Sequence, residues 1–261
     1  MELLKNILWA TDFSNESKTA LRYAHYLSGM FGARLTALHV VPDFSPLLYE
    51  LSSEHQPEML GKVENTKATG HKKVEQLCES EGVSPAAIIV KEGPAATVII
   101  ETSREVKADL IVVGRKGATG SEKSQIGSVA HKLLRTSSIP VLITKGTGPK
   151  PDIKKIMVPT DFVESEEVER DYAWKLARRL GASLTFLYVF ELFGHDLRLT
   201  DELFAEALKK LKARRKREHI DVGISEKVTR AFNAAEGIID AAEHDSFDLI
   251  VMSSVVKKLP R

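Results

Sequence analysis

An internal repeat is the feature that most narrows what this chain can fold into. Residues 5–13 read KNILWATDF and residues 154–162 read KKIMVPTDF, an offset of 149 positions. The same offset pairs further residues without a gap: Ala24 with Ala173, Leu27 with Leu176, Gly32 with Gly181 and Val40 with Val189. Later in the chain, ADLIVVG at 108–114 recurs as FDLIVMS at 247–253. Self-similarity over this length predicts two copies of one structural unit.

The two copies are expected to form two domains. A length of 261 residues suits two domains of ordinary size. We place domain 1 at 1–146 and domain 2 at 153–261, joined by a linker at 147–152. The linker overlaps the segment GTGPKP at 146–151, whose glycines and prolines are typical of a connection between domains.

Apolar runs alternate with helical patterns in the first copy, which indicates an α/β fold. The predicted strands are 7–10, 35–41, 87–91, 109–113 and 140–144. Helices are predicted between a capping Ser14 and a terminating Gly32, and at about 57–81, 95–106 and 124–135. Strands that are apolar throughout and separated by helices predict a parallel sheet covered on both faces. We therefore expect two tandem, doubly wound, Rossmann-like domains, the second of them shortened.

Candidate ligand-binding residues cluster where the predicted strands end. Strand 1 ends in Ala10-Thr11-Asp12, strand 2 in His39-Val40-Val41 and strand 4 in Val113-Gly114. In a parallel sheet these ends meet at one rim, and ligands bind there at the point where the strand order reverses. The carboxylate of Asp12 can accept hydrogen bonds from a ribose or a base.

A glycine-rich segment follows the fourth strand and favours phosphate binding. It reads GRKGATGSEKSQIGS over residues 114–128, and its glycines predict positive φ angles and close backbone approach to a ligand. Ser128 and Val129 would open the next helix, whose first N–H groups attract anions. Basic residues of the segment would add mobile positive charge: Arg115, Lys116 and Lys123. The segment is not a P-loop, because Glu122 stands where that motif has glycine.

These features resemble the universal stress protein family. The spacing Gly114-x2-Gly117-x9-Gly127-Ser128 matches the family's ATP-binding signature, with all four positions filled. The family's first strand commonly ends in Pro-Thr-Asp, which appears here as Ala10-Thr11-Asp12 and again as Pro159-Thr160-Asp161. The resemblance covers residues 1–146 and, less specifically, about 153–254. It implies an adenine nucleotide alpha hydrolase-like form of the Rossmann-like fold, in the tandem arrangement of the family's two-domain members.

The resemblance also implies a role for each candidate residue in binding ATP or AMP, with Mg²⁺ as an accompanying ion. Asp12 and the backbone of Val40 would hold the adenosine, and Thr11 and Ala10 would line its pocket. Around the phosphates, and at the strand end beside them, would lie Val113, Gly114, Arg115, Gly117, Gly127, Ser128 and Val129. Alanine at position 10 departs from the family's usual proline and changes one wall of the pocket.

The second copy departs further from this pattern. Ser253 and Val256 stand at the positions of Gly114 and Gly117, and no counterpart of Gly127-Ser128 follows them. A β-branched side chain at the second position should block both the turn and the approach of a phosphate. We therefore expect a degenerate domain 2, without the phosphate loop and the last strand, and one nucleotide per chain.

Composition limits the other functions to be considered. Lys and Arg total 37 against 36 for Asp and Glu, and this net charge of +1 gives no general attraction to nucleic acid. No apolar run is long enough to span a membrane, so a cytoplasmic protein with no membrane partner is expected. Cys78 is the sole cysteine, which excludes an intrachain disulfide. We expect no metal site built from histidines or cysteines, and we interpret the basic run at 209–217 as a solvated helical face.

Three functions stay open at this point. The first is a regulatory, stress-response protein that senses ATP or AMP. The second is an enzyme, a slow ATPase or a nucleotidyl-transfer relative, for which only Glu122 offers a carboxylate near the loop. The third is an assembly module that binds no nucleotide. The resemblance implies pairing through the edge strand at 141–144, either as a homodimer or between the two domains of one chain. The loop at 42–56 would be a lid over the adenosine, a dimer contact or a segment packed on its own domain.

Overall fold

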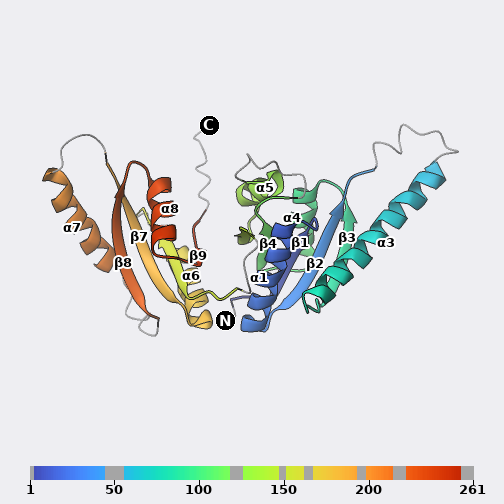
Figure 1. Ribbon diagram of the computed structural model, residues 1–261, viewed down its shortest axis with the longest axis horizontal. Helices are drawn as coiled ribbons and strands as arrows, with labels where there is room; N and C mark the ends of the chain where they lie inside the picture. Colours follow the sequence, from blue (N-terminus) through green and yellow to red (C-terminus); the bar gives the residue numbers. More distant parts are fainter. Residues whose placement is uncertain are drawn as a thin grey trace. The chain divides into compact units, whose positions relative to one another are not determined.

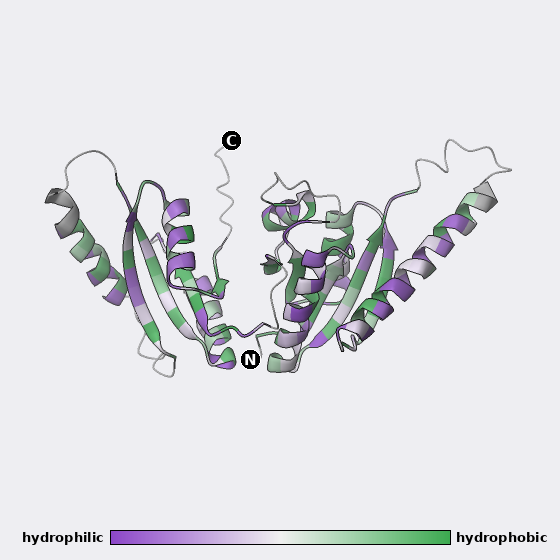
Figure 2. Cartoon of the chain, viewed as in Figure 1, coloured by the Kyte–Doolittle hydropathy of each residue, from purple (hydrophilic) through white to green (hydrophobic). Residues whose placement is uncertain are grey.

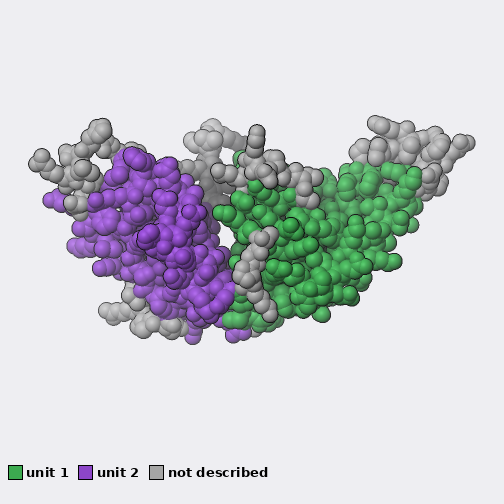
Figure 3. All heavy atoms as spheres, viewed as in Figure 1, with its two compact units in different colours: residues 1–151 green, residues 152–261 purple. Residues whose placement is uncertain are grey.

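Two compact units, Met1–Pro151 and Asp152–Arg261, make up the chain (Figures 1 and 3). The computed structural model describes residues 3–44, 56–117, 126–146, 151–161, 167–192, 198–213 and 222–253. The division between the units falls inside the predicted linker at 147–152. Each unit contains one parallel sheet with helices packed on it, so the predicted α/β, Rossmann-like class is confirmed.

Unit 1 is built on a five-stranded parallel sheet. Its strands are β1 (Asn6–Thr11), β2 (Arg34–Val41), β3 (Ala87–Glu92), β4 (Leu110–Gly114) and β5 (Val141–Thr144). They lie in the order β3-β2-β1-β4-β5. The chain runs outward from β1 through β2 and β3 and then returns to the other side of β1 for β4. The strand order therefore reverses between β1 and β4, where a crevice for a ligand is expected.

Helices cover both faces of this sheet. They are α1 (Asn15–Phe31), α3 (Gln56–Ser80), α4 (Ala95–Glu105) and α5 (Ser128–Thr136). α4 and α5 pack on the face that carries Leu8, Leu38 and Ile111. Trp9 points to the opposite face, because successive side chains of a strand alternate, and its Nε1 donates to the carbonyl of Ser17 in α1 at 2.9 Å. In Figure 2 the inner strands of this sheet, β1, β2 and β4, are mainly hydrophobic, whereas the helices alternate between hydrophobic and hydrophilic residues.

The predicted elements of the first copy are confirmed, with one helix shifted. All five strands agree with the prediction to within one residue at each end. The Ser14 hydroxyl caps α1 by accepting from the Ser17 amide at 3.1 Å, and Gly32 ends the helix with a left-handed φ of 67°. The helix predicted from residue 124 begins only at Ser128. Gly127 stays extended because its amide donates to the carbonyl of Arg115 at 2.8 Å.

Unit 2 repeats this plan with four strands among its described residues. These are β6 (Lys155–Pro159), β7 (Ser183–Glu191), β8 (Ile224–Ala231) and β9 (Leu249–Ile250), in the order β8-β7-β6-β9. Its helices are α6 (Glu167–Leu180), α7 (Arg198–Ala213) and α8 (Ala234–His244). The order matches β3-β2-β1-β4 of unit 1, strand for strand. In the described part of the chain, no helix is both long and apolar enough to cross a membrane.

An aspartate fastens the same two strands in both units. In unit 1 the carboxylate of Asp109 accepts from the amides of Lys5 and Asn6 at 2.7 and 2.9 Å. In unit 2 the carboxylate of Asp248 accepts from the amides of Lys154 and Lys155 at 2.8 and 2.9 Å. The repeated Asp-Leu-Ile-Val of the sequence thus has a structural basis, since its first residue joins the start of one strand to that of its neighbour.

Candidate functional site

A pocket of about 320 Å³ opens at the carboxyl ends of β1 and β4, where the strand order reverses. All eleven site residues proposed from the sequence line it: Ala10, Thr11, Asp12, Val40, Val113, Gly114, Arg115, Gly117, Gly127, Ser128 and Val129. They come from three strands, the turn between β1 and α1, the segment after β4 and the first turn of α5. Glu122 and Lys123 lie outside the described residues.

One side of the pocket is apolar. Ala10 and Val113 supply it from the ends of β1 and β4, and Val40 supplies it from β2. The N-terminal halves of two helices, α4 and α5, extend this wall with three residues that the sequence reasoning missed: Ala95, Ile99 and Ala130. Their only sequence signal is helical periodicity, which predicts burial and does not distinguish a pocket wall from the core.

The turn from β1 into α1 places Asp12 at the pocket. The Asp12 side chain is exposed, and its Oδ1 accepts from the amide of Ser14 at 3.1 Å. Phe13 between them has a φ of 66°, a left-handed conformation that is unusual for a residue with a side chain. Its amide is held by Thr11 Oγ1 at 3.0 Å. Two hydrogen bonds from the flanking residues thus stabilise a strained turn that aims the carboxylate at the rim.

Thr11 is part of a buried polar network beneath this turn. Its hydroxyl lies 3.0 Å from that of Ser17, which in turn donates to the carbonyl of Ser14 at 2.9 Å. The Thr11 carbonyl lies 2.9 Å from Nδ1 of His39, so the imidazole must carry its proton on that nitrogen. Thr11 therefore shapes the pocket floor through contacts within the protein.

The three described glycines of the signature act through close approach, because none has a positive φ. The prediction of positive φ is therefore wrong for Gly114, Gly117 and Gly127, and Gly120 lies outside the described residues. A Cβ on Gly114 would lie 2.8 Å from the Glu16 carbonyl carbon, in the backbone of α1. On Gly117 it would lie 2.6 Å from Asp12 Oδ2.

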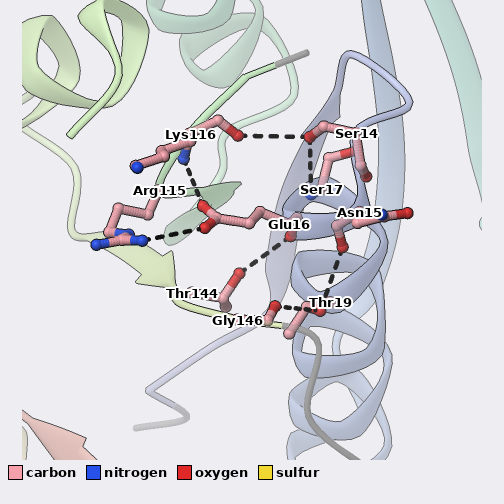
Figure 4. A network of polar contacts seen from close by, with 9 residues as sticks. All are labelled: Ser14, Asn15, Glu16, Ser17, Thr19, Arg115, Lys116, Thr144 and Gly146. Atoms are coloured by element: carbon pink, nitrogen blue, oxygen red, sulfur yellow. Dashed lines mark hydrogen bonds and ion pairs between the residues drawn. The ribbon is translucent and has the colours of Figure 1, made fainter. Parts of the chain in front are cut away.

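Glu16 binds the segment that follows β4 (Figure 4). Its Oε2 accepts from the Lys116 amide at 2.5 Å, and its Oε1 accepts from Nη2 of Arg115 at 3.3 Å. The Lys116 carbonyl in turn accepts from the Ser14 hydroxyl at 3.4 Å. The prediction that the charge of Arg115 is mobile is therefore wrong, because its guanidinium is paired with a carboxylate. Sequence reasoning missed Glu16, since 99 residues separate it from Arg115.

The opening of α5 supplies hydrogen-bond donors to the pocket. Gly127 is the N-cap and offers no side-chain cap, so the first-turn amides of the helix lack that partner. Ser128 and Val129, the first two residues of α5, line the pocket. Together with the positive end of the helix dipole, these amides form an arrangement that favours an anion.

Comparison with known proteins relates this geometry to a family. The model of the universal stress protein family matches residues 4–145 and 152–261. The chain belongs to the universal stress protein family.

Some relatives within this family match one unit's length, and others match nearly the whole chain. A universal stress protein of Methanocaldococcus jannaschii is 36% identical over 146 residues, which are 55% of this chain and 83% of that protein. One of Bacillus subtilis is 30% identical over 157 residues, 55% of this chain and 100% of that protein. The crystal structure of a universal stress protein from Archaeoglobus fulgidus aligns over 96% of this chain and 89% of its own, at 22% identity and a TM-score of 0.62. The last similarity shows the shared fold.

In this member of the universal stress protein family, unit 2 arranges the corresponding residues differently. Asp161 is exposed, as Asp12 is, and Ser253 stands at the position of Gly114. Val189, the counterpart of Val40, is buried under α8. A Cβ on Gly237 would lie only 2.5 Å from Cγ1 of Val189, so this glycine lets α8 pack directly on β7. Val256 lies outside the described residues.

Proposed function

We propose that unit 1 binds one adenine nucleotide, ATP or AMP, and that the protein is a nucleotide-responsive regulator of the stress response. The observation that carries the proposal is the pocket at the reversal of strand order. Every residue of the family's ATP-binding signature in this sequence lines it. Family membership supports the same function through the resemblance of those residues.

The two sides of the pocket suit the two parts of a nucleoside. A base would pack against the apolar wall formed by Val40, Ile99 and Ala130, since small-molecule sites are mostly apolar with a few polar groups that orient the ligand. Asp12 supplies such a group at the rim, where its carboxylate can accept hydrogen bonds from ribose hydroxyls.

The phosphates would bind chiefly at the start of α5. Three described amides of the segment after β4 are already used within the protein. The amide of Lys116 donates to Glu16, that of Gly127 to the carbonyl of Arg115, and that of Arg115 to the carbonyl of Thr144. Among the described residues, the first-turn amides of α5, at Ser128 and Val129, are then the main donors directed at an anion. The absence of a Cβ at Gly117 keeps the passage beside Asp12 open for the phosphate chain.

The described carboxylates beside the pocket favour nucleotide binding over turnover, because both already accept hydrogen bonds within the protein. Asp12 accepts from the Ser14 amide and Glu16 accepts from Lys116 and Arg115. A water-positioning base for phosphoryl transfer needs a carboxylate oxygen directed at the terminal phosphate. We therefore assign no catalytic residue among the described residues, which do not include Glu122.

Calorimetric titration of ligand-free protein with ATP, ADP and AMP tests the proposal, and a matched pair of variants locates the site. We expect one nucleotide per chain, at least a tenfold loss of affinity in Asp12→Ala, and less than a twofold change in Asp161→Ala. Fluorescence of Trp9, which is fully buried in unit 1, checks that the Asp12 variant is folded. Two nucleotides per chain, or equal losses in the two variants, would contradict the assignment to unit 1.

A further inference from the structure

The contact between Glu16 and Arg115 bears on which nucleotide the site prefers, and the inference rests on the proposed function. Arg115 lines the pocket, yet its Nη2 lies 3.3 Å from a Glu16 oxygen. The Nε of Arg115 is buried and finds no hydrogen-bond partner among the described residues. The guanidinium is therefore only partly satisfied, at the edge of a site that suits phosphates.

We propose that Glu16 sets the preference of the site for the number of phosphates, by retaining Arg115 and by placing a negative charge beside the phosphate subsite. The guanidinium of arginine matches phosphate oxygens with paired hydrogen bonds, so an unretained Arg115 would be a strong ligand of a phosphate chain. A carboxylate that holds it lowers the affinity for ATP more than for AMP, because ATP carries more negative charge.

The geometry of Glu16 gives the carboxylate two separable tasks. One oxygen accepts from the Lys116 amide at 2.5 Å and so holds the backbone of the loop. The other accepts from the Arg115 guanidinium. The side chains of Glu16 and Arg115 are 16% and 27% exposed, so water screens their charges only in part. A neutral glutamine can keep the first contact through its carbonyl oxygen, but it loses the charge of the second.

Two substitutions at this position separate the tasks. We expect Glu16→Gln to raise the affinity for ATP relative to AMP by about three- to tenfold, because a charge is removed near the phosphates and Arg115 is released. Glu16→Ala also loses the contact to the Lys116 amide, so it should weaken binding of both nucleotides. Hydrogen exchange without nucleotide reports on the loop: the Lys116 amide should stay protected in Glu16→Gln and exchange faster in Glu16→Ala.

The double variant Glu16→Gln/Arg115→Ala supplies the control. If Arg115 carries the gain, most of the added preference for ATP should disappear in the double variant. Calorimetry with ATP and AMP on all four proteins provides the ratio of the two dissociation constants. If Glu16 had a purely structural role, its replacement would weaken the binding of both nucleotides alike and leave this ratio unchanged. An unchanged ratio in Glu16→Gln, or a ratio shifted toward AMP, would overturn the proposal.

The titration also separates failure of this inference from failure of the proposed function. A wild-type protein that binds neither nucleotide contradicts the proposed function as it stands. ATP binding that then appears in Glu16→Gln would support the role of Glu16, as a carboxylate that closes the site to phosphates. Silence in both proteins would overturn the inference as well.

Discussion

The two units share a strand order and an aspartate clip, by which we mean the two backbone amides bound by Asp109 in unit 1 and by Asp248 in unit 2. They differ in what covers the fourth strand. In unit 1, α5 and β5 pack beside β4, and Ile111 and Val113 are 0% and 5% exposed. The corresponding residues of unit 2, Ile250 and Met252, are 38% and 58% exposed. The same strand pattern is thus core in one unit and surface in the other. The elements that bury β4 also carry the phosphate end of the pocket, so core and candidate site depend on the same segment.

The largest expected difference between the units concerns this buried strand. Ile111→Ala should destabilise unit 1 by about 3 to 4 kcal/mol, because it leaves a cavity in a closed core, whereas Ile250→Ala should cost less than about 1 kcal/mol. Each unit contains one of the chain's two tryptophans, Trp9 in unit 1 and Trp174 in unit 2. Variants that keep only one of them allow each unit to be followed separately in urea. Equal losses in both units would mean that Ile250 is buried in solution as well.

A glycine at the end of β4 distinguishes the units next. Gly114→Ser copies the residue of unit 2 into unit 1 and places a Cβ within 3 Å of the α1 backbone. We expect a loss of about 2 to 3 kcal/mol in unit 1 from overpacking, together with weaker nucleotide binding. The reverse change, Ser253→Gly, alters an exposed position and should shift stability by less than about 0.5 kcal/mol. If Gly114→Ser changed neither the stability of unit 1 nor its nucleotide binding, the ends of β4 and β9 would be interchangeable.

The aspartate clip should instead make the units behave alike. Asp109→Ala and Asp248→Ala each remove a carboxylate that accepts two amides, and we expect each to cost its own unit about 1 to 2 kcal/mol. The measurement is again urea unfolding followed by the tryptophan of each unit. A loss confined to one unit would mean that the repeated clip contributes to stability in only one copy.

The smallest expected effect is the dependence of stability on acid pH. In unit 1 the Arg22 guanidinium lowers the pKa of Glu81 below its ordinary value of 4.5, and in unit 2 Lys227 and then His244 lower the pKa of Asp245 below 3.8. A lowered pKa means that the stabilisation is present above the ordinary value and is lost as the pH falls through the pKa of the folded state. Because these pairs are partly exposed, each should contribute at most about 1 kcal/mol.

Isosteric amides test this contribution in both units. At pH 7, Glu81→Gln and Asp245→Asn should each be less stable than wild type by this contribution. The difference from wild type should vanish as the pH falls below the lowered pKa of each carboxyl group in the folded state. A difference that persists undiminished at low pH would assign the effect to packing. It would also mean that these ion pairs do not contribute to the stability of either unit.

Much of the fold and the rim of the site could be predicted from the sequence, because both depend on local patterns. The repeat and the alternation of apolar strands with helices predicted two parallel-sheet units, and strand bounds were correct to within one residue in unit 1. The site residues could be placed at one rim because parallel strands share the direction of their carboxyl ends. Ser14 and Gly32 marked the ends of α1 through capping chemistry that involves only neighbouring residues.

Only the tertiary structure decided what these residues contact. Glu16 meets Arg115 across 99 positions, and the need for glycine at position 114 comes from the backbone of α1 and not from its own φ. The late start of α5 depends on a hydrogen bond from Gly127 to Arg115. Likewise, Ile111 and Ile250 have the same local sequence and opposite exposure. Local patterns encode how each segment folds, but burial and pairing depend on which distant segment packs against it.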